Sequence, residues 1–564
     1  MTEVAPPRSL VALAPVLQGE GQWAFGHREP LNENERVKRE DDPLNVRARI
    51  EGVYSREGFK SIDPEDLRVR FRWWGLYTQR RPNIDGGRTA VLEPHELEDE
   101  YFMLRVRVDG GQLDLEQLRA VAEVSRRYAR DSADITDRQN IQLHWVRVED
   151  MPAIWRRLEG VGLSTTEACG DCPRVVLGSP VAGISADEVL DGTPAIQEIV
   201  RRYVGDPSLS NLPRKFKSSV SWLTDVPYET NDISFIGAVH PEHGPGFDLW
   251  LGGGLSTNPM LAQRPGTWVP LDRVAEVWHG VVSLFRDYGY RRLRHRARLK
   301  FLVADWGVAR FREVLESEYL ATPLVDGPPP ELPHAPVSHL GVHPQRDGRC
   351  YVGAAPVVGR LSGTRLDALA DLVAAHGATR VRLTPYQKLL ILDVERDRLE
   401  TLVPALPGVG LSAEPSSWRA ATMACTGIEF CKLAIVETKQ RAASLVAELE
   451  RRLAGLDADI SINLNGCPNA CARTQVADIG LKGQLMRGAG GDMVEGFQVH
   501  LGGGLALAAS RSGALGRKVR GMKTTAEELP DFVERLALRY LAGRTGPGEP
   551  FAHWVSRVDE GELK

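Results

Sequence analysis

The sequence predicts an α+β protein made of two pseudo-symmetric repeats of mixed sheets and helices. Three observations support this fold class. Several short motifs return about 250 residues later, helical and strand-like periodicities alternate within each copy, and cysteines follow the repeated segment in both copies. A length of 564 residues is sufficient for several domains, each with its own core.

The repeat is visible at landmarks that keep a nearly constant separation. Three pairs lie 248 residues apart, and the motif LGGGL recurs after 250 residues: Thr136 with Thr384, Gln139 with Gln387, Gly162 with Gly410, and residues 251–255 with 501–505. The sequence therefore predicts two α+β units of about 240 residues each. The proline-rich segment 326–337, DGPPPELPHAPV, is the expected joint between them.

Periodicity predicts the elements within each unit. Residues 113–129 have apolar side chains at helical spacing, and IQLHWVRV at 141–148 follows as a strand. In the second unit we expect a helix over 432–453. The alternating segment 457–466 then predicts a strand that delivers Cys467 from its end.

Strand alternation also gathers polar and cationic side chains on common faces. We expect four such faces: Arg105 with Arg107; Asp134, Thr136, Arg138, Asn140, Gln142 and His144; Lys215, Lys217 and Ser219; and Arg294, Arg296, Arg298 and Lys300. Each face taken alone is typical of a strand with a solvated side. Four together, in a chain of net charge −5, favour a pocket for a polyanionic ligand.

Four cysteines near the C-terminus form a candidate metal centre. Cys425 and Cys431 are separated by five residues, and Cys467 and Cys471 by three. Four thiolates make a soft, closed ligand set that suits an iron–sulfur cluster or a structural zinc. Structural zinc sites usually repeat a tight C-x2-C spacing, which neither pair has, so the spacing favours a cluster and leaves zinc as the alternative.

Composition excludes several classes of protein. The net charge of −5 gives no overall basic field for nucleic acid, and no apolar run approaches the roughly 20 residues that span a bilayer. Seven cysteines in a chain of this length do not suggest a disulfide framework, and the N-terminal apolar stretch lacks a signal-peptide cleavage site. We therefore expect a cytoplasmic protein.

At this point the motifs resemble a known family, the siroheme- and [4Fe–4S]-containing sulfite and nitrite reductases. The resemblance rests on CTGIEFC at 425–431 and NGCPNAC at 465–471, supported by TDRQNIQLHW, GDCPRVVLGSP and PRKFK, and is closest to the actinobacterial-type ferredoxin-dependent enzymes. It implies two repeats around a shared cofactor site. The implied domains are an N-terminal extension wrapping the core at 1–90, ferredoxin-like half-domains at 91–165 and 336–417, a siroheme- and substrate-binding domain at 166–335, and a [4Fe–4S]- and siroheme-binding domain at 418–564.

The resemblance also implies roles for individual residues. Cys425, Cys431, Cys467 and Cys471 would hold the cluster, and Cys471 would also bridge to the siroheme iron. The substrate-binding cations would be Arg105, Arg174, Lys215 and Lys217. The siroheme carboxylates would meet Arg138, Gln142 and His144, with Arg214, Arg298 and Lys300 as further candidates.

The implied reaction is the six-electron reduction of sulfite to sulfide for sulfur assimilation. Ferredoxin-dependent reduction of nitrite to ammonia is the alternative, because both conversions take six electrons. Family nitrite reductases tend to have Asn where this chain has Lys217, which favours sulfite. The resemblance implies reduced ferredoxin as the donor, with a separate flavoprotein as the alternative. The internal repeat makes a monomer the expected state.

Cys169 and Cys172 form a further C-x-x-C pair. On its own the pair is compatible with a redox dithiol, half of a zinc site or two buried thiols. In the actinobacterial-type enzymes a cysteine at the position of Cys169 is joined by a thioether to a tyrosine, and Tyr77 matches that tyrosine. The resemblance therefore predicts a Tyr77–Cys169 crosslink.

Overall fold

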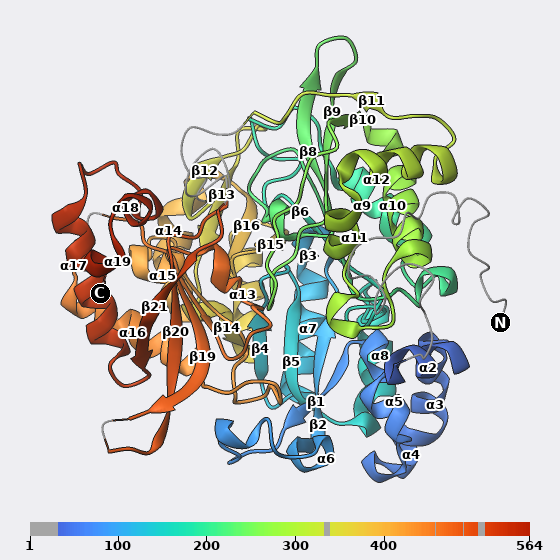
Figure 1. The fold of residues 1–564 in the computed structure, drawn as a ribbon, viewed down its shortest axis with the longest axis horizontal. Coiled ribbons are helices and arrows are strands. Elements are labelled where there is room, and N and C mark those ends of the chain that lie inside the picture. The colour runs from blue at the N-terminus through green and yellow to red at the C-terminus, as the bar shows by residue number, and fades with distance from the viewer. Residues whose placement is uncertain (1–31, 332–338, 457, 489, 506–513, 564) are drawn as a thin grey trace.

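The computed structural model describes residues 32–331, 339–456, 458–488, 490–505 and 514–563. The apolar stretch near the N-terminus and most of the proline-rich joint, residues 332–337, lie outside these ranges. The described chain folds into two small five-stranded sheets, a six-stranded sheet and a further five-stranded sheet, with helices packed against them (Figure 1). This arrangement confirms the predicted α+β class.

The two small sheets lie at the centre of the molecule, and each borrows a strand from the other repeat (Figure 1). The first has the order β1 (Leu76–Arg80), β2 (Glu98–Val106), β5 (Ile141–Val146), β4 (Ser132–Ile135) and β14 (Arg360–Ser362). The second has the order β12 (Gly341–Pro344), β13 (Cys350–Ala354), β16 (Leu389–Val394), β15 (Arg380–Leu383) and β3 (Gln112–Asp114). The exchanged strands β14 and β3 join the repeats through backbone hydrogen bonds, in antiparallel register with β4 and β15.

Each larger sheet belongs to one repeat. The six-stranded sheet has the order β11 (Val325–Asp326), β10 (Thr267–Val269), β9 (Gly244–Leu251), β8 (Ile233–His240), β7 (Phe216–Ser221) and β6 (Pro173–Gly178). The other, here called the cysteine sheet, has the order β17 (Thr422–Ala424), β18 (Ile462–Asn465), β19 (Ile479–Arg487), β20 (Met493–Leu501) and β21 (Arg517–Thr525). Both contain three parallel strands followed by an antiparallel one, which is the structural form of the sequence repeat.

The helices cover these sheets and close three large cores. The small sheets pack with α2 (Glu33–Glu40), α3 (Val46–Arg49), α4 (Ser55–Glu57), α5 (Pro64–Arg68), α6 (Pro94–Leu97), α7 (Leu115–Tyr128), α8 (Met151–Glu159), α13 (Gly363–Ala375) and α14 (Leu399–Ala405). The six-stranded sheet packs with α9 (Thr193–Tyr203), α10 (Val274–Tyr288), α11 (Leu299–Trp306) and α12 (Val308–Val314), and the cysteine sheet with α15 (Ser417–Ala421), α16 (Lys439–Arg452), α17 (Leu529–Gly543), α18 (Phe551–Arg557) and α19 (Glu560–Leu563). None of the helices in the described ranges has the length and apolar character needed to cross a membrane.

One continuous apolar core unites the two small sheets. Helix α7 of the first repeat contributes Leu118 and Val121 to it, and α13 of the second contributes Leu366 and Leu369. Burial of such side chains stabilises the folded state by about 1.5–3 kcal/mol each. The repeats are therefore joined by a shared core as well as by exchanged strands.

Two of the predicted strands are wrong in detail. Residues 132–146 form a hairpin of β4 and β5, not one strand, because Gln139 takes a left-handed conformation (φ 54°) in the turn between them. The segment around Arg294, Arg296, Arg298 and Lys300 is a short 3-10 turn followed by helix α11, not a strand. Its cations therefore do not share a strand face.

The helix predicted over 432–453 begins later, at Lys439. The preceding residues instead form a loop against the end of β18, where the Ile435 N–H donates to the carbonyl of Gly466 at 2.7 Å. The helix predicted at 113–129 is confirmed as α7, whose first turn Asp114 caps by accepting from the N–H of Gln117. The strand expected before Cys467 is confirmed as β18, although shorter than predicted.

Candidate functional site

Two adjoining cavities lie where the two repeats meet. The main cavity has a volume of about 370 Å³ and the adjoining cavity about 230 Å³. Six residues line both of them: Asp137, Arg214, Lys215, Arg294, Asn469 and Cys471. A ligand larger than either cavity could therefore extend past Cys471 from one into the other.

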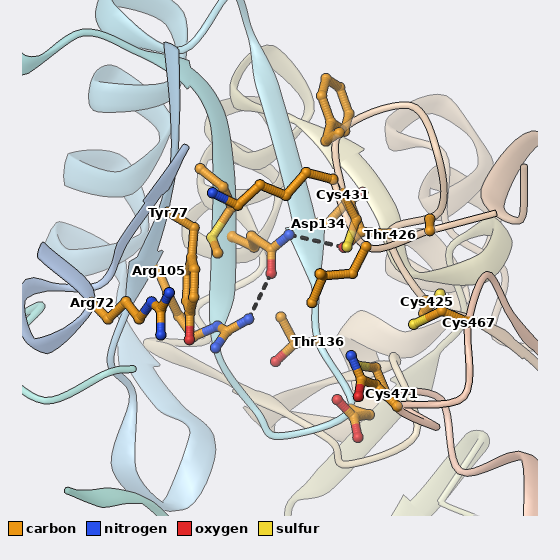
Figure 2. Close-up of a pocket in the computed structure, with 18 of the residues that line it drawn as sticks. Arg72, Tyr77, Arg105, Asp134, Thr136, Cys425, Thr426, Cys431, Cys467 and Cys471 are labelled. Carbon is orange, nitrogen blue, oxygen red and sulfur yellow. Dashed lines mark hydrogen bonds between the residues drawn. The ribbon is translucent and has the colours of Figure 1, made fainter. Parts of the chain in front are cut away.

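All four predicted cluster cysteines line the main cavity, and Cys471 lines the adjoining one as well. Strands β17 and β18 run parallel, so their carboxyl ends lie side by side. Cys425 directly follows β17 and Cys467 lies two residues after β18. Figure 2 shows the cysteines on one side of the pocket, opposite Tyr77 and Arg105.

The environment of these thiols suits a metal centre. Burial raises the pKa of Cys425 to about 12, with the neighbouring Cys471 adding to the shift, so its thiolate needs a nearby positive charge. Within the described ranges, no three His, Cys, Asp or Glu side chains gather closely enough to hold a single metal ion. Four thiolates are the ligand set of an iron–sulfur cluster and also of a structural zinc.

Two lysines provide cations that the protein itself does not use. Lys217 lies on β7 and Lys215 one residue before that strand. Lys215 lines both cavities and Lys217 lines the adjoining one, and neither ammonium has a hydrogen-bond or ion-pair partner among the described residues. Burial, reinforced by Arg138, lowers the pKa of Lys217 to about 7, and burial together with Lys217 lowers that of Lys215. Such amines favour an anionic ligand.

A chain of hydrogen bonds crosses the main cavity (Figure 2). Arg105 on β2 donates to the Cys169 thiol at 2.9 Å and to the Gln142 side chain at 3.0 Å. Gln142 on β5 donates in turn to the Thr426 hydroxyl at 3.0 Å. The chain ties the first small sheet to the loop between Cys425 and Cys431.

His144 lies deeper on the same strand. Its ring stacks on Phe430 at 3.8 Å between centroids, and its Nε2 lies 3.5 Å from Asp134. Burial lowers the pKa of His144, so the ring is neutral at physiological pH. Its Nδ1 is buried without a hydrogen-bond partner in the described structure, which leaves one polar atom for a ligand.

The remaining predicted arginines line the cavities but are already bound by the protein. Arg174 donates to the carbonyls of Ala168 and Gly170, and Arg138 to the Asn231 side chain and two carbonyls. Arg298 forms a two-pronged ion pair with Asp232, and Arg214 lies 3.6 Å from Asp171.

Lys300 is different from these arginines. Its ammonium donates to three backbone carbonyls, those of Gly254, Leu255 and Asn258, and a lysine has only three N–H donors. A contact between Lys300 and a cofactor carboxylate would have to replace one of these bonds, and it stays a prediction. In the described structure Lys300 fastens the loop after β9.

Tyr77 and Cys169 are brought together behind Arg105. Tyr77 lines the main cavity, and Cys169 is fully buried. Burial, followed by the nearby Cys169, raises the pKa of Tyr77. The proximity of Tyr77 and Cys169 is compatible with the predicted crosslink, which stays a prediction. Cys172 is a buried packing residue, and its thiol donates to the carbonyl of Cys169 at 2.8 Å.

Sequence reasoning missed several lining residues. Arg72 lies over the Tyr77 ring at 5.7 Å, and Asn469 lines both cavities. Arg473 donates to the carbonyls of Asp137 and Pro385 and so clamps the Cys471 segment to the tips of both small sheets. Asn469 could have been predicted from its position between Cys467 and Cys471. Arg473 could not, because its contacts join residues up to 336 positions apart and leave no local signal in the sequence.

Comparisons with known proteins agree with this architecture. The family model "Nitrite and sulphite reductase 4Fe-4S domain" matches residues 169–324 and 417–564, and "Nitrite/Sulfite reductase ferredoxin-like half domain" matches 95–161 and 343–407. Each model matches once in each repeat.

Relatives match over nearly the whole chain. A protein of Mycobacterium tuberculosis named sulfite reductase [ferredoxin] is 58% identical over 551 residues, 97% of this chain and 98% of that protein. The solved structure of the Mycobacterium tuberculosis NirA protein superposes with a TM-score of 0.94 at 58% identity, covering 97% of this chain and 100% of that one. An assimilatory ferredoxin-dependent nitrite reductase of Haloferax mediterranei is 35% identical, over 90% of this chain and 89% of that protein. These matches, together with the paired cavities and the cysteine sheet, show that the chain belongs to the nitrite and sulfite reductase family.

Proposed function

We propose that this protein reduces sulfite to sulfide with electrons from reduced ferredoxin. The observation that carries the proposal is the pair of half-buried ammoniums of Lys215 and Lys217, which have no partner among the described residues; Lys215 and Cys471 line both cavities, and Lys217 lines the adjoining one. Sulfite approaches a dianion near neutral pH, and two free cations match that charge. The high identity to relatives named sulfite reductase, against 35% for a nitrite reductase, supports the same choice.

The residues present fit siroheme and a [4Fe–4S] cluster. Cys425, Cys431, Cys467 and Cys471 would hold the cluster, and Cys471 reaches both cavities, as a ligand shared with the siroheme iron must. The cations of the lining, including Arg138, Arg214 and Arg298, suit the eight carboxylates of siroheme. When bound, these cofactors would relay electrons from the donor to the substrate, and reduced ferredoxin would supply all six.

The protein's own contribution is charge and protons. Removing three oxygens from sulfite as water consumes six protons, which must arrive at the bound anion. Lys217 has a pKa of about 7, set by burial and by Arg138, so it can both hold an anion and release a proton near neutral pH. Arg105 and Arg174, fixed by their bonds to Cys169, Gln142 and the 168–170 carbonyls, provide positive charge at constant positions.

The alternative is nitrite reduction to ammonia, and one substitution separates the two. Lys217→Asn removes a cation that a dianion needs more than a monoanion does. We expect kcat/KM for sulfite to fall about 100-fold, the typical cost of one lost electrostatic contact to the reacting anion, and kcat/KM for nitrite to fall less. Both constants are measured with one electron donor. Equal losses would remove the role given to Lys217, and a clear wild-type preference for nitrite would overturn the sulfite assignment.

The cysteine sheet offers a docking surface for an acidic donor. Lys482, Lys518 and Lys523, together the cationic sheet face, lie on neighbouring strands on the side away from the α16 and α17 core. Among the described residues none of them forms an ion pair, and burial together with Lys482 and Lys518 lowers the pKa of His500 between them, so this ring is neutral. In the sheet, Lys482 on β19 lies opposite Asn465 on β18, two residues before Cys467, so a donor bound here would lie one strand away from a cluster ligand.

Charge reversal tests this surface. Lys518→Glu should raise KM for reduced ferredoxin and weaken the dependence of KM on ionic strength, while activity with a small chemical reductant stays unchanged. Lys60→Glu, an equal charge change on an exposed residue of the N-terminal helical segment, is the control. An unchanged KM for ferredoxin in Lys518→Glu would exclude the cationic sheet face as the docking site.

A further inference from the structure

Arg80 is a buried cation placed against one of the cluster cysteines. It ends β1 and is 2% exposed. Its backbone N–H donates to the carbonyl of Phe430 at 2.8 Å, and its guanidinium donates to the carbonyls of Lys432 at 3.4 Å and Ala434 at 3.3 Å. Arg80 therefore contacts the chain on both sides of Cys431.

This guanidinium has no ion-pair partner among the described residues, and the charge of Asp85 acts on it only from beyond ion-pair distance. Its other bonds go to the carbonyls of Ile84 and Asp85, at 2.7 to 3.1 Å, and to the hydroxyl of Thr89 at 3.0 Å. Within the described ranges no acidic side chain lies within ion-pair distance of Arg80. Buried Arg107, by contrast, has Asp109 at 2.7 Å. A buried charge without a partner is costly, so a compensating anion is to be expected nearby.

Because Arg80 contacts the chain on both sides of Cys431, the thiolate of Cys431 is the anion that would compensate its charge. The neighbouring cation Lys432 is already paired with Glu98 and bonded to the Thr78 hydroxyl, so it adds little net charge. The segment after Arg80 also lies close over the loop, because a Cβ on Gly86 would come within 1.7 Å of the Ile435 carbonyl oxygen. This close packing keeps water away from Arg80 and strengthens its field.

We propose that Arg80 is a positioning residue that raises the reduction potential of the [4Fe–4S] cluster through its buried charge. The inference rests on the proposed cofactors. One electron from the donor makes the cluster with its four thiolates more negative by one charge. A fixed cation beside Cys431 stabilises the reduced form more than the oxidised form, which makes electron transfer from the donor more favourable.

The first test replaces the charge at Arg80. Arg80→Gln should shift the reduction potential of the cluster to a more negative value, followed in a redox titration by the electron paramagnetic resonance signal of the reduced cluster. Arg80→Lys keeps the charge and should shift it much less. Arg81→Gln makes the same charge change at the next residue, which is exposed and donates to the Glu98 carbonyl, and should leave the potential unchanged.

The second test leaves Arg80 in place and adds the missing carboxylate. Thr89 lies within hydrogen-bond distance of the guanidinium, so Thr89→Asp would neutralise it, whereas Thr89→Asn has the same shape without the charge. We expect a more negative potential for Thr89→Asp than for Thr89→Asn. This pair tests the charge even if Arg80→Gln does not fold.

Two results would overturn the inference. One is an unchanged potential in Arg80→Gln or in Thr89→Asp with full iron and sulfide content, and the other is an equal shift in Arg80→Lys and Arg80→Gln, which would point to hydrogen bonding and not charge. Wild-type protein purified without iron and acid-labile sulfide would instead contradict the proposed cofactors, so the two failures are distinguishable.

Discussion

The tip of each small sheet is fastened to a larger sheet in the same way in both repeats. Gln139 and Gln387 both take left-handed backbone conformations, with φ of 54° and 62°. The amide of Gln139 accepts from the N–H and donates to the carbonyl of Gly178, at the end of β6. The amide of Gln387 makes the same two bonds to Ala424, at the end of β17. The frame around the two junctions is thus equivalent.

The residues directly after these two strands are not equivalent. The residue after Gly178 is Ser179, whereas the residue after Ala424 is Cys425. Ser179 donates to Asp225 at 2.6 Å, and Asp225 also bonds His339 at 2.9 Å. We call the region around Cys425 the open junction and the region around Ser179 the filled junction.

The strands beside the junctions differ in the same sense. Gln142 and His144 on β5 line the main cavity of the open junction. Their counterparts 248 residues later, Leu390 and Leu392 on β16, pack instead into an apolar cluster with Val181, Ile184 and Tyr351. The comparison teaches that the duplicated backbone provides two places for a cofactor, and that cysteines and polar side chains keep only one of them available.

Exchanging the first ligand position between the junctions should have the largest effect. Cys425→Ser gives the open junction the residue of the filled one. We expect the affinity for the cluster to fall by more than the roughly 10–100-fold typical of lost supporting contacts, because a direct ligand is removed, so the purified protein should hold little cluster. Visible absorbance, iron and acid-labile sulfide per protein measure this loss, and sulfite reduction should disappear with it.

Ser179→Cys is the matched change in the filled junction. One added thiol beside Asp225 does not complete a ligand set, so iron content and the visible spectrum should match those of the wild type. Full cluster content in Cys425→Ser, or extra iron in Ser179→Cys, would break the assigned difference between the junctions.

Much of this comparison could be predicted from the sequence, because its signals are local or periodic. The offset of 248 residues located Gln139 and Gln387, and the spacing of the cysteines located the metal centre. The exchange of β3 and β14 between the small sheets left no such signal, because it depends on pairing between residues more than 200 positions apart.

The cations show where pattern reasoning stops. Alternation around Arg298 resembled a strand, but a short apolar and basic run cannot distinguish a strand from a helix, and the segment is α11 with Arg298 bound to Asp232. Sequence alone also could not separate Lys217, whose ammonium is free, from Lys300, whose ammonium is fully used by carbonyls. That distinction depends on the folded positions of distant backbone groups.

Leucines of the filled junction should matter for stability and not for the cofactors. Leu390 is fully buried, so Leu390→Ala should lower the free energy of unfolding by about 2–5 kcal/mol, measured by denaturant titration. The visible spectrum of the protein that stays folded should be unchanged. Gln142→Leu, the corresponding change in the open junction, should lower sulfite reduction with less loss of stability, because it removes the bonds to Arg105 and Thr426 without leaving a void. Loss of cofactor absorbance in Leu390→Ala would show that the filled junction contributes to the site.

The smallest effect that we expect is a pH dependence of kcat/KM that depends on Lys217 and not on Lys388. Burial lowers the pKa of Lys217 to about 7, and burial likewise lowers the pKa of Lys388 to about 7. A lysine is charged below its pKa, so the charge of Lys217 is lost as the pH rises through about 7, and kcat/KM should fall by up to about tenfold between about pH 6 and pH 8. Nitrite is the suitable substrate for this measurement, because it stays a monoanion over this range whereas sulfite itself titrates.

Two variants assign the titration. Lys217→Arg keeps the charge at every pH and should flatten the profile. Lys388→Arg should leave the profile unchanged, since Lys388 donates to the Thr422 carbonyl and lines neither cavity. A profile that persists in Lys217→Arg would assign the titration to another group and remove Lys217 as the proton donor of the site.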